Sequence, residues 1–295
     1  MALANMNMNM NMNMNMNMSA SRLTGESIRC NTLPISREAF DPSPGKFLVQ
    51  VRPGTGYSNY KGKWDAEHKA WSLISEFVTA QPSWISPTSA AATAVWSGWA
   101  SQAALNNAIL QMIDYAGERE SRFAEIIGQH DGEGTINYWL GMLDIDPSKH
   151  PNTYLLVRFA RKLGEMVVMC LKAQFDAARP SQLSPAVVPM LDAPGTATFP
   201  SGHALQAYLI SYLLIRAFPN IPQSTPPAAW LPATTHTGIF ALSRRIADNR
   251  MTAGLHFDVD NQAGYEVAKV LGTLLDTLPS SSNFKQLLTA ASAEF

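Results

Sequence analysis

Charge is scarce in this sequence, and blocks of like charge are missing from it. Asp, Glu, Lys and Arg make up 15% of the 295 residues, and the formal net charge is −1. A typical soluble protein has about 25% charged residues, and a disordered chain is more polar still. A nucleic-acid-binding protein normally carries a basic excess or patch. Composition therefore excludes a disordered chain and argues against nucleic acid or an anionic membrane as partner.

Long hydrophobic runs and paired cysteines are missing too. The most apolar stretch, Ala204 to Leu214, contains Gln206 and is shorter than the about 20 residues that a membrane-spanning helix needs. Cys30 and Cys170 lie 140 positions apart and form neither a CxxC pair nor a disulfide framework. We therefore expect a soluble protein without a transmembrane segment, and composition leaves its oligomeric state open.

The N-terminal residues have an unusual composition. Asn and Met alternate from Asn5 to Met18. A secretory signal needs a basic region, a continuous apolar region and a small-residue cleavage site in that order, and the alternation supplies none of them. We expect residues 1–20 to form a disordered low-complexity tail outside the fold. Without a recognisable signal peptide, the sequence favours a cytoplasmic over an exported protein, although it does not fix the compartment.

Proline and hydrophobic periodicity divide the remaining chain. Residues 21–62 contain four prolines and no sustained periodicity, which predicts an irregular arm. Residues 63–295 show helical periodicity and few strand signals, so we predict one all-α domain. The helices are expected at Lys63–Thr79, Ser89–Ala116, Glu118–Gly128, Thr135–Leu143, Tyr154–Ala178, Pro200 to before Pro219, about Thr237–Arg250 and about Asp258–Thr277.

The helix Tyr154–Ala178 ends in the first of three polar clusters. It is apolar on most sides, which predicts a central position. Lys172 and Arg179 lie seven positions apart, nearly two helical turns, so we expect both cations on one face at its C-terminal end. The ordinary alternative is helix C-cap chemistry, because cations favour that end of any helix.

The second cluster, Pro200-Ser201-Gly202-His203, opens the next predicted helix. Free amides at a helix N-terminus form an anion-binding site, and glycine lets a ligand approach the backbone closely. His203 would then lie in the first turn, beside a bound anion. The alternative is a plain serine N-cap with an incidental histidine.

The third cluster holds Arg250, then His256 six positions later, then Asp260 four positions after that. If the last helix includes His256, Asp260 lies on the same face one turn on. A carboxylate there can hold the imidazole Nδ1–H and leave Nε2 free as a nucleophile or ligand. Gly254 would allow a sharp turn into this helix. The alternative is a solvated His–Asp pair.

Together the clusters supply three fixed cations, helix-end amides, one oriented histidine and a second histidine. This set is suited to binding a tetrahedral oxyanion and to stabilising its five-coordinate transition state. One histidine can attack phosphorus while the other protonates the leaving oxygen. Such chemistry requires no metal.

In kind and order, the three motifs resemble the signatures of the phosphatidic acid phosphatase type 2 / vanadium haloperoxidase superfamily, over about residues 150–275. One position departs from that pattern, because Asn249 stands where the family usually has Ser before the Arg. The resemblance implies a helical-bundle core. It also implies roles for the matched residues: His256 as phosphate nucleophile or vanadate ligand, His203 as general acid/base, Asp260 as the group that orients His256, and Lys172, Arg179, Ser201, Gly202 and Arg250 as oxyanion-binding residues.

The resemblance implies two activities for one site. The favoured hypothesis is a metal-independent, cofactor-free acid phosphatase that acts on phosphomonoesters. The chain is compact, whereas haloperoxidases of this superfamily are usually much longer, and the missing transmembrane helices argue against the integral-membrane lipid phosphatases. The alternative is a vanadium-dependent haloperoxidase that uses halide and peroxide, because vanadate adopts the trigonal-bipyramidal geometry that phosphoryl transfer passes through.

Two further hypotheses come from other classes. His203, His256 and Asp260 could form a two-His-one-carboxylate iron site, which three neighbouring cations would oppose by repulsion. The chain could also be a non-catalytic helical interaction domain. The other histidines, His68, His130, His150 and His236, have no matching partners in the sequence, and we interpret them as surface or ordinary structural residues.

Overall fold

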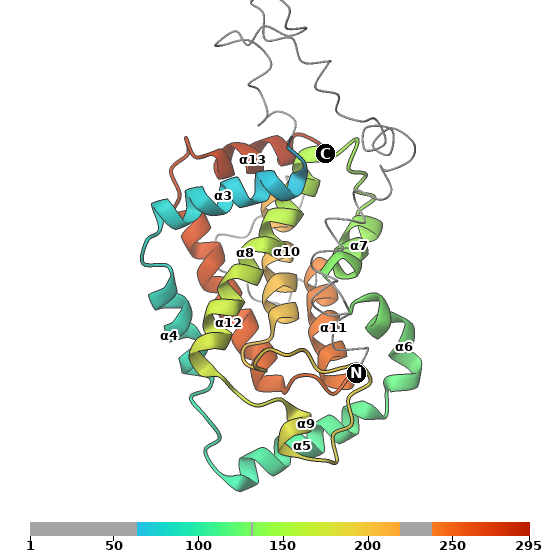
Figure 1. Ribbon diagram of the computed structural model, residues 1–295. Coiled ribbons are helices and arrows are strands. Elements are labelled where there is room, and N and C mark those ends of the chain that lie inside the picture. Colours follow the sequence, from blue (N-terminus) through green and yellow to red (C-terminus); the bar gives the residue numbers. More distant parts are fainter. Residues whose placement is uncertain (1–63, 131, 219–237) are drawn as a thin grey trace, which may run out of the picture. The chain divides into compact units, whose positions relative to one another are not determined.

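Three long helices form the centre of the structure, a computed structural model that describes residues 64–130, 132–218 and 238–295 (Figure 1). All regular secondary structure in these ranges is helical, so the predicted all-α class is confirmed. These residues belong to one compact unit, Lys61–Phe295. The predicted tail (1–20), the predicted arm (21–62) and the Pro-rich connection (219–237) lie outside the described residues.

The central helices are α8 (Pro151–Phe175), α10 (Gly202–Ala217) and α12 (Asp258–Asp276). Helix α8 begins at a proline, whose fixed φ suits the first helical position. Helix α10 is buried on nearly all sides and packs against both α8 and α12. The apolar stretch Ala204 to Leu214, which is too short to span a membrane, therefore belongs to the innermost helix of the fold.

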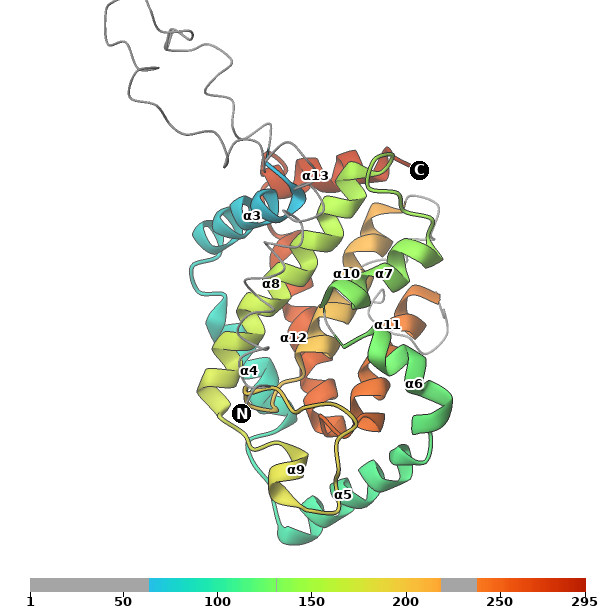
Figure 2. The ribbon, with the colours of Figure 1, turned by 45° about the vertical axis from the view of Figure 1, so that its right-hand side comes forward.

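Shorter helices cover this centre. Helices α3 (Ala66–Ala80) and α13 (Asn283–Ser292) pack against α8 at one end, and α4 (Ile85–Val95) packs against α12 (Figures 1 and 2). Helix α11 (Gly238–Thr252) lies on α10 and is itself contacted by α5 (Gln102–Ala116), α6 (Arg119–Gly128) and α7 (Gly132–Met142).

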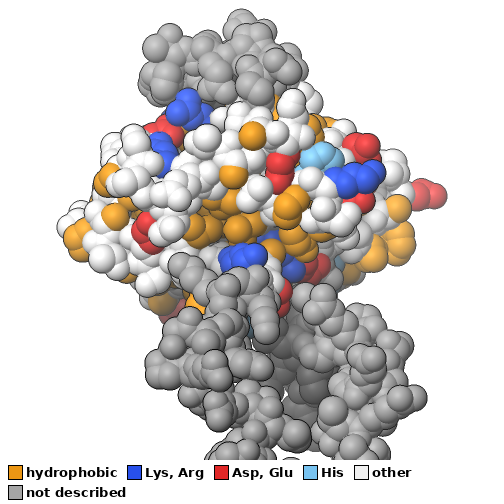
Figure 3. Space-filling view, turned by 90° about the horizontal axis from the view of Figure 1, so that it is seen from above, with side chains coloured by type: hydrophobic (Ala, Val, Ile, Leu, Met, Phe, Trp, Pro, Cys, Tyr) orange, Lys and Arg blue, Asp and Glu red, His pale blue; other side chains and the backbone are white. Residues whose placement is uncertain are grey.

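The surface agrees with the low charge of the sequence. In the described part of the face seen in Figure 3, charged side chains of both signs are scattered among polar and apolar groups. Within the described ranges, no helix combines the length and the apolarity needed to cross a membrane.

Two expectations about the helices were wrong. The single helix predicted over Ser89–Ala116 is broken into α4 and α5, because Gly98 adopts a left-handed φ of 137° and Ser101 caps α5 by accepting a hydrogen bond from the Ala104 amide at 3.1 Å. Helix α8 stops at Phe175, because the next residue, Asp176, has a φ of 44°. Helix α13 and the short helix α9 (Pro180–Leu183) were not predicted.

A glycine lets α12 approach the start of α10 closely. A Cβ atom built on Gly264 would lie 2.8 Å from the carbonyl oxygen of Ser201 and 2.9 Å from the amide nitrogen of Leu205. Both are backbone atoms, so they cannot move aside as the end of a flexible side chain would. The contact fixes the spacing between the first turns of these two helices, where the polar motifs lie.

We expect Gly264→Ala to lower the free energy of unfolding by about 1–3 kcal/mol in urea denaturation, because the added methyl group overpacks this contact. The matched control is Gly141→Ala in α7, where a Cβ would meet nothing within 4 Å. The control should gain up to about 1 kcal/mol from helix propensity. Equal effects of the two changes would contradict the assigned role of Gly264.

Candidate functional site

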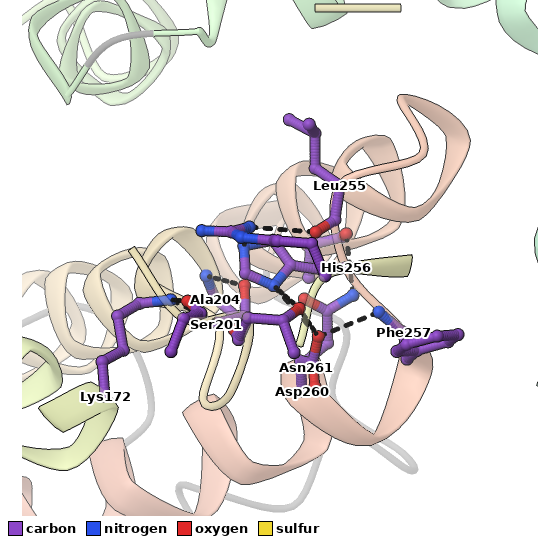
Figure 4. Close-up of polar contacts among 12 residues, drawn as sticks. Lys172, Ser201, Ala204, Leu255, His256, Phe257, Asp260 and Asn261 are labelled. Carbon is purple, nitrogen blue, oxygen red and sulfur yellow. Dashed lines mark hydrogen bonds and ion pairs between the residues drawn. The ribbon is translucent and has the colours of Figure 1, made fainter. Parts of the chain in front are cut away.

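His256 lies in the turn that leads into α12, not in the helix itself. The helix begins at Asp258, as predicted, with extended Phe257 as its N-cap, so the condition that the last helix includes His256 is not met. The predicted pair still forms, because the Asp260 side chain folds back over the helix start. Its Oδ2 accepts hydrogen bonds from the Phe257 amide at 3.0 Å and from Nδ1 of His256 at 3.1 Å (Figure 4). Gly254, with a φ of 81°, makes the expected sharp turn just before.

The pair is buried rather than solvated. His256 is 4% exposed and Asp260 is 1% exposed, which excludes the solvated-pair alternative. An ionised carboxylate only accepts hydrogen bonds, so Nδ1 of His256 carries the proton. Nε2 then carries the lone pair, and Nη1 of Arg179 lies 3.2 Å from it. The imidazole is thus held in the tautomer with an unprotonated Nε2, which accepts a hydrogen bond from Arg179 and becomes a nucleophile when an anion draws that guanidinium away.

Thr198 completes the support of Asp260 and was missed from the sequence. Its hydroxyl donates to Oδ2 of Asp260 at 2.5 Å and lies 3.3 Å from Nδ1 of His256. No periodicity or spacing marks this threonine, which is 58 positions from the histidine. Its position two residues before Pro200, in the second motif, is the signal that could have found it.

Lys172 reaches the segment that precedes α10. The side chain is 6% exposed, and its Nζ donates to the carbonyl oxygens of Ala197 and of Thr198, the latter at 3.1 Å. It therefore does not cap the carbonyls of its own last turn, as the C-cap alternative requires.

Arg179 joins the same segment from outside α8. The helix ends at Phe175, and Arg179 is the N-cap of α9, so the expectation that it shares one helical face with Lys172 was wrong. Its guanidinium is buried and donates to the carbonyl oxygens of Thr196 at 2.9 Å and Leu255 at 3.0 Å. Both cations still converge on residues 196–198.

Arg250 is the most buried of the three cations, at 0% exposure near the end of α11. Its Nη2 donates to the carbonyl oxygen of Ile126 in α6 at 3.1 Å. Nε and Nη1 are buried and have no hydrogen-bond partner among the described residues. Buried donors of this kind are costly, and a bound oxyanion would satisfy them.

Positive charge dominates the electrostatics of this site. Burial, helped by the neighbouring Arg179, lowers the pKa of Lys172 to about 7. Burial lowers the pKa of both Arg179 and Arg250 to about 10. In the part of the chain that the structure describes, no salt bridge pairs any of the three with Asp or Glu. An anion is the natural counter-charge.

The start of α10 faces the same region. The Ser201 amide donates to the Asp260 carbonyl oxygen at 2.9 Å, and Ser201 Oγ accepts from the Ala204 amide at 3.3 Å (Figure 4). Ser201 is thus the N-cap of α10, as the alternative interpretation of this motif predicts. Helix geometry leaves the amides of Gly202 and His203 without partners inside the helix.

His203 has a fixed tautomer as well. Its Nε2 lies 3.0 Å from the carbonyl oxygen of Gln129, which can only accept, so Nε2 carries the proton and Nδ1 the lone pair. Burial, then the charges of Arg250 and His256, hold the pKa of His203 well below its usual value. Burial and the charge of Arg179 do the same for the pKa of His256.

The structure therefore connects most of the predicted site residues. Direct contacts through residues 196–198 and Leu255 join Lys172, Arg179, Ser201, His256 and Asp260. Arg250 and His203 are both anchored on backbone carbonyls at the end of α6. Gly202 begins α10 beside them.

The other histidines have ordinary surroundings. His68 is exposed beside Asp65, and His130 is exposed. His150 accepts from the Asp146 amide at 3.2 Å and stacks on Phe295. These three are confirmed as surface or structural residues, and His236 lies outside the described residues.

A divalent metal cation does not suit these residues. The described ranges contain no group of three His, Cys, Asp or Glu side chains arranged for a metal ion. Arg179 also lies 3.2 Å from Nε2 of His256, where a divalent cation would have to bind. Like charges at such a distance repel strongly in a buried site, so the geometry disfavours the iron hypothesis.

Comparison with known proteins adds a likeness to solved structures. No protein-family model and no curated protein matches this chain. Among solved structures, one match is the crystal structure of the first transmembrane PAP2 type phosphatidylglycerolphosphate phosphatase from Bacillus subtilis. It is 18% identical, and the match covers 70% of this chain and 94% of that chain with a TM-score of 0.29. A TM-score of this size does not establish a shared fold, so the functional argument rests on the site alone.

Inorganic phosphate should bind this cluster, and the protein should take up protons on binding. At pH 8 a Lys172 with a pKa of about 7 is mostly neutral, and a bound dianion favours its charged form. Calorimetric titration in two buffers of different ionisation enthalpy should show net proton uptake at pH 8. Uptake should be smaller in Lys172→Met, and unchanged in the control Lys149→Met, whose lysine lies in the exposed turn before α8. Equal uptake in both variants would contradict the assignment.

Proposed function

We propose that this protein is a phosphatase that hydrolyses phosphomonoesters through a phosphohistidine intermediate on His256. The observation that carries the proposal is the buried His256–Asp260 pair, with Nε2 unprotonated, beside three buried cations that form no salt bridge with a carboxylate among the described residues. A nucleophile held next to concentrated positive charge is what an anionic phosphoester requires.

The first half-reaction forms a phosphorus–nitrogen bond. Nε2 of His256 attacks phosphorus with its lone pair, and the bond from phosphorus to the ester oxygen breaks. Charge spreads over the equatorial oxygens in the transition state, where Lys172, Arg179, Arg250 and the first amides of α10 would stabilise it. Asp260 stabilises the positive charge that develops on the imidazole. His203, protonated on Nδ1 when a dianion raises its pKa, gives that proton to the leaving oxygen, and an alcohol departs.

The second half-reaction returns the enzyme to its starting state. Nδ1 of His203, now neutral, accepts a proton from a water molecule as that water attacks phosphorus. The phosphorus–nitrogen bond breaks, Nε2 of His256 regains its lone pair, and inorganic phosphate forms. Each proton that His203 gives in the first step is recovered in the second, so no metal or further cofactor is needed.

The same residues would also fit vanadate, with Nε2 of His256 as ligand and the three cations around its oxygens. Bound vanadate would supply the activation of peroxide that halide oxidation requires. No contact among the described residues favours halide oxidation over phosphoester hydrolysis. Halide oxidation therefore enters the experiment as the contrary outcome.

The purified protein should release p-nitrophenol from p-nitrophenyl phosphate in the presence of EDTA, and vanadate should inhibit it competitively. Rapid acid-free quenching with a ³²P-labelled ester should trap a phosphoenzyme that is stable to base and labile to acid. His256→Gln should abolish the trapped species and lower kcat at least about 10³-fold.

The matched control is His68→Gln, which removes an exposed histidine and should leave both readouts unchanged. Bromination of an indicator dye with peroxide and vanadate, without ester hydrolysis, would replace the proposal by the haloperoxidase alternative. If wild type shows neither activity, the result favours the hypothesis of a non-catalytic helical interaction domain.

The activity should also fall on the acid side of neutrality. Burial raises the pKa of Asp260 to about 6. Below that pH the carboxyl is protonated, and a neutral acid no longer stabilises the imidazolium that forms on His256. We expect kcat/KM to lose up to tenfold per pH unit below about pH 6, in addition to the titration of the substrate. Asp260→Asn should lack this additional decline and be about 10²–10⁴-fold slower at its optimum. If the decline of kcat/KM at low pH is unchanged in Asp260→Asn, it belongs to another group.

A further inference from the structure

Asn249, the residue that departs from the family pattern, is fully buried where α11 faces α6. It is 0% exposed and precedes Arg250 directly. Its Oδ1 accepts a hydrogen bond from Nη1 of Arg122 at 3.2 Å. Because an arginine only donates, this contact fixes which end of the amide is which. Nδ2 is thus the donor end, and it points toward α6.

Nδ2 of Asn249 makes two hydrogen bonds. It donates to Oε2 of Glu125 at 3.0 Å and to Oε1 of Gln129 at 2.8 Å. A serine hydroxyl has a single hydrogen to donate and a shorter reach, so it could not make both bonds. The amide at this position therefore donates two hydrogen bonds where the usual serine could donate one.

Gln129 continues the path to the site. It is the C-cap of α6 and is 0% exposed, and its own backbone carbonyl accepts the Nε2–H of His203 at 3.0 Å. Its side-chain Nε2 has no partner among the described residues, so the bond from Asn249 is the contact that the structure shows for this side chain. The same carbonyl also accepts the Thr135 hydroxyl at 3.2 Å, and the Gln129 amide donates to the Glu125 carbonyl oxygen at 2.9 Å. The bond from Asn249 therefore adds a side-chain anchor to this carbonyl.

We propose that Asn249 is a positioning residue for proton transfer: through Gln129 it holds the carbonyl that keeps one proton on Nε2 of His203 and leaves Nδ1 as the atom that gives and takes the mobile proton. The inference rests on the proposed function and names a further residue for that same site. The charged and titratable groups that face His203 are Arg250 from α11, His256 from the turn before α12, and His130 after α6.

Comparing two leaving groups distinguishes a loss of proton transfer from general damage to the structure. Protonation of the leaving oxygen matters for an alkyl phosphate, whose alkoxide is a poor leaving group, and matters little for p-nitrophenyl phosphate. Asn249→Asp keeps the size of the side chain and loses both donated bonds. We expect it to lower kcat/KM about tenfold or more for glycerol phosphate and less than about threefold for p-nitrophenyl phosphate, because kcat/KM reports the first half-reaction and leaves out the hydrolysis step that both esters share.

The matched control is Arg245→Gln, on the same α11–α6 interface. Arg245 donates to both carboxylate oxygens of Glu125, at 2.7 and 2.9 Å, and has no hydrogen bond to Gln129 among the described residues. This variant should change kcat/KM for the two esters by the same small factor. An equal loss on both esters in Asn249→Asp would overturn the proposal and leave Asn249 a merely structural residue.

A second measurement does not need activity. Nitrogen-15 NMR of histidine-labelled protein reports which ring nitrogen is protonated, and His203→Gln assigns the signal. Wild type should show the Nε2–H tautomer at His203, and Asn249→Asp should show a mixture of tautomers. An unchanged tautomer in Asn249→Asp overturns the proposal even if wild type hydrolyses neither ester, in which case the phosphatase assignment fails separately.

Discussion

Buried positive charge that forms no salt bridge with a carboxylate in the described part of the chain is the constraint on which this structure depends. Lys172, Arg179 and Arg250 are almost fully buried, and each is held by backbone carbonyls at the end of a helix or beside a turn. Carbonyls fix the direction of a cation without cancelling its charge, whereas a carboxylate would do both. The buried cations thus lower the stability of the fold. The packing of α8, α10, α11 and α12 has to hold the charges together against their repulsion.

Asp260 is the one acidic side chain among these groups, and it organises the pocket. Its Oδ2 gathers the His256 ring, the Phe257 amide and the Thr198 hydroxyl, and its carbonyl oxygen accepts the Ser201 amide. One residue thus ties the start of α12 to the start of α10. The glycine at position 264 allows that close approach, because a side chain there would collide with the backbone of α10.

Local spacing explains what could be predicted from the sequence. The pairing of His256 with Asp260 and the capping by Ser201 depend on neighbours within four positions, so a pattern can reveal them. A shared helical face was one way to form the first pair, and the structure forms it in another way, because the Asp260 side chain accepts the Phe257 amide at the start of α12. Likewise most helices were predicted, while the break at Gly98 was not, since a helix tolerates a single glycine at a cost of about 1 kcal/mol relative to alanine.

Contacts across long separations explain what could not be predicted. Thr198 lies 62 positions from Asp260, and Gln129 lies 74 positions from His203 and 120 from Asn249. Nothing in one sequence shows that α6 ends beside α10, because that depends on how α11 packs between them. The unusual Asn249 was visible as a departure, but its partners were not.

The uncompensated arginine in α11 has a consequence for the catalytic cycle. Nε and Nη1 of Arg250 have no partner in the described protein, so any tetrahedral anion that reaches them gains the same hydrogen bonds, whether it is the ester or the inorganic phosphate left after hydrolysis. Under the proposed function the pocket cannot favour the arriving ester over the departing product by charge alone. Product phosphate would then compete with the ester for the pocket, and the resting enzyme in a phosphate-rich medium would be a phosphate complex.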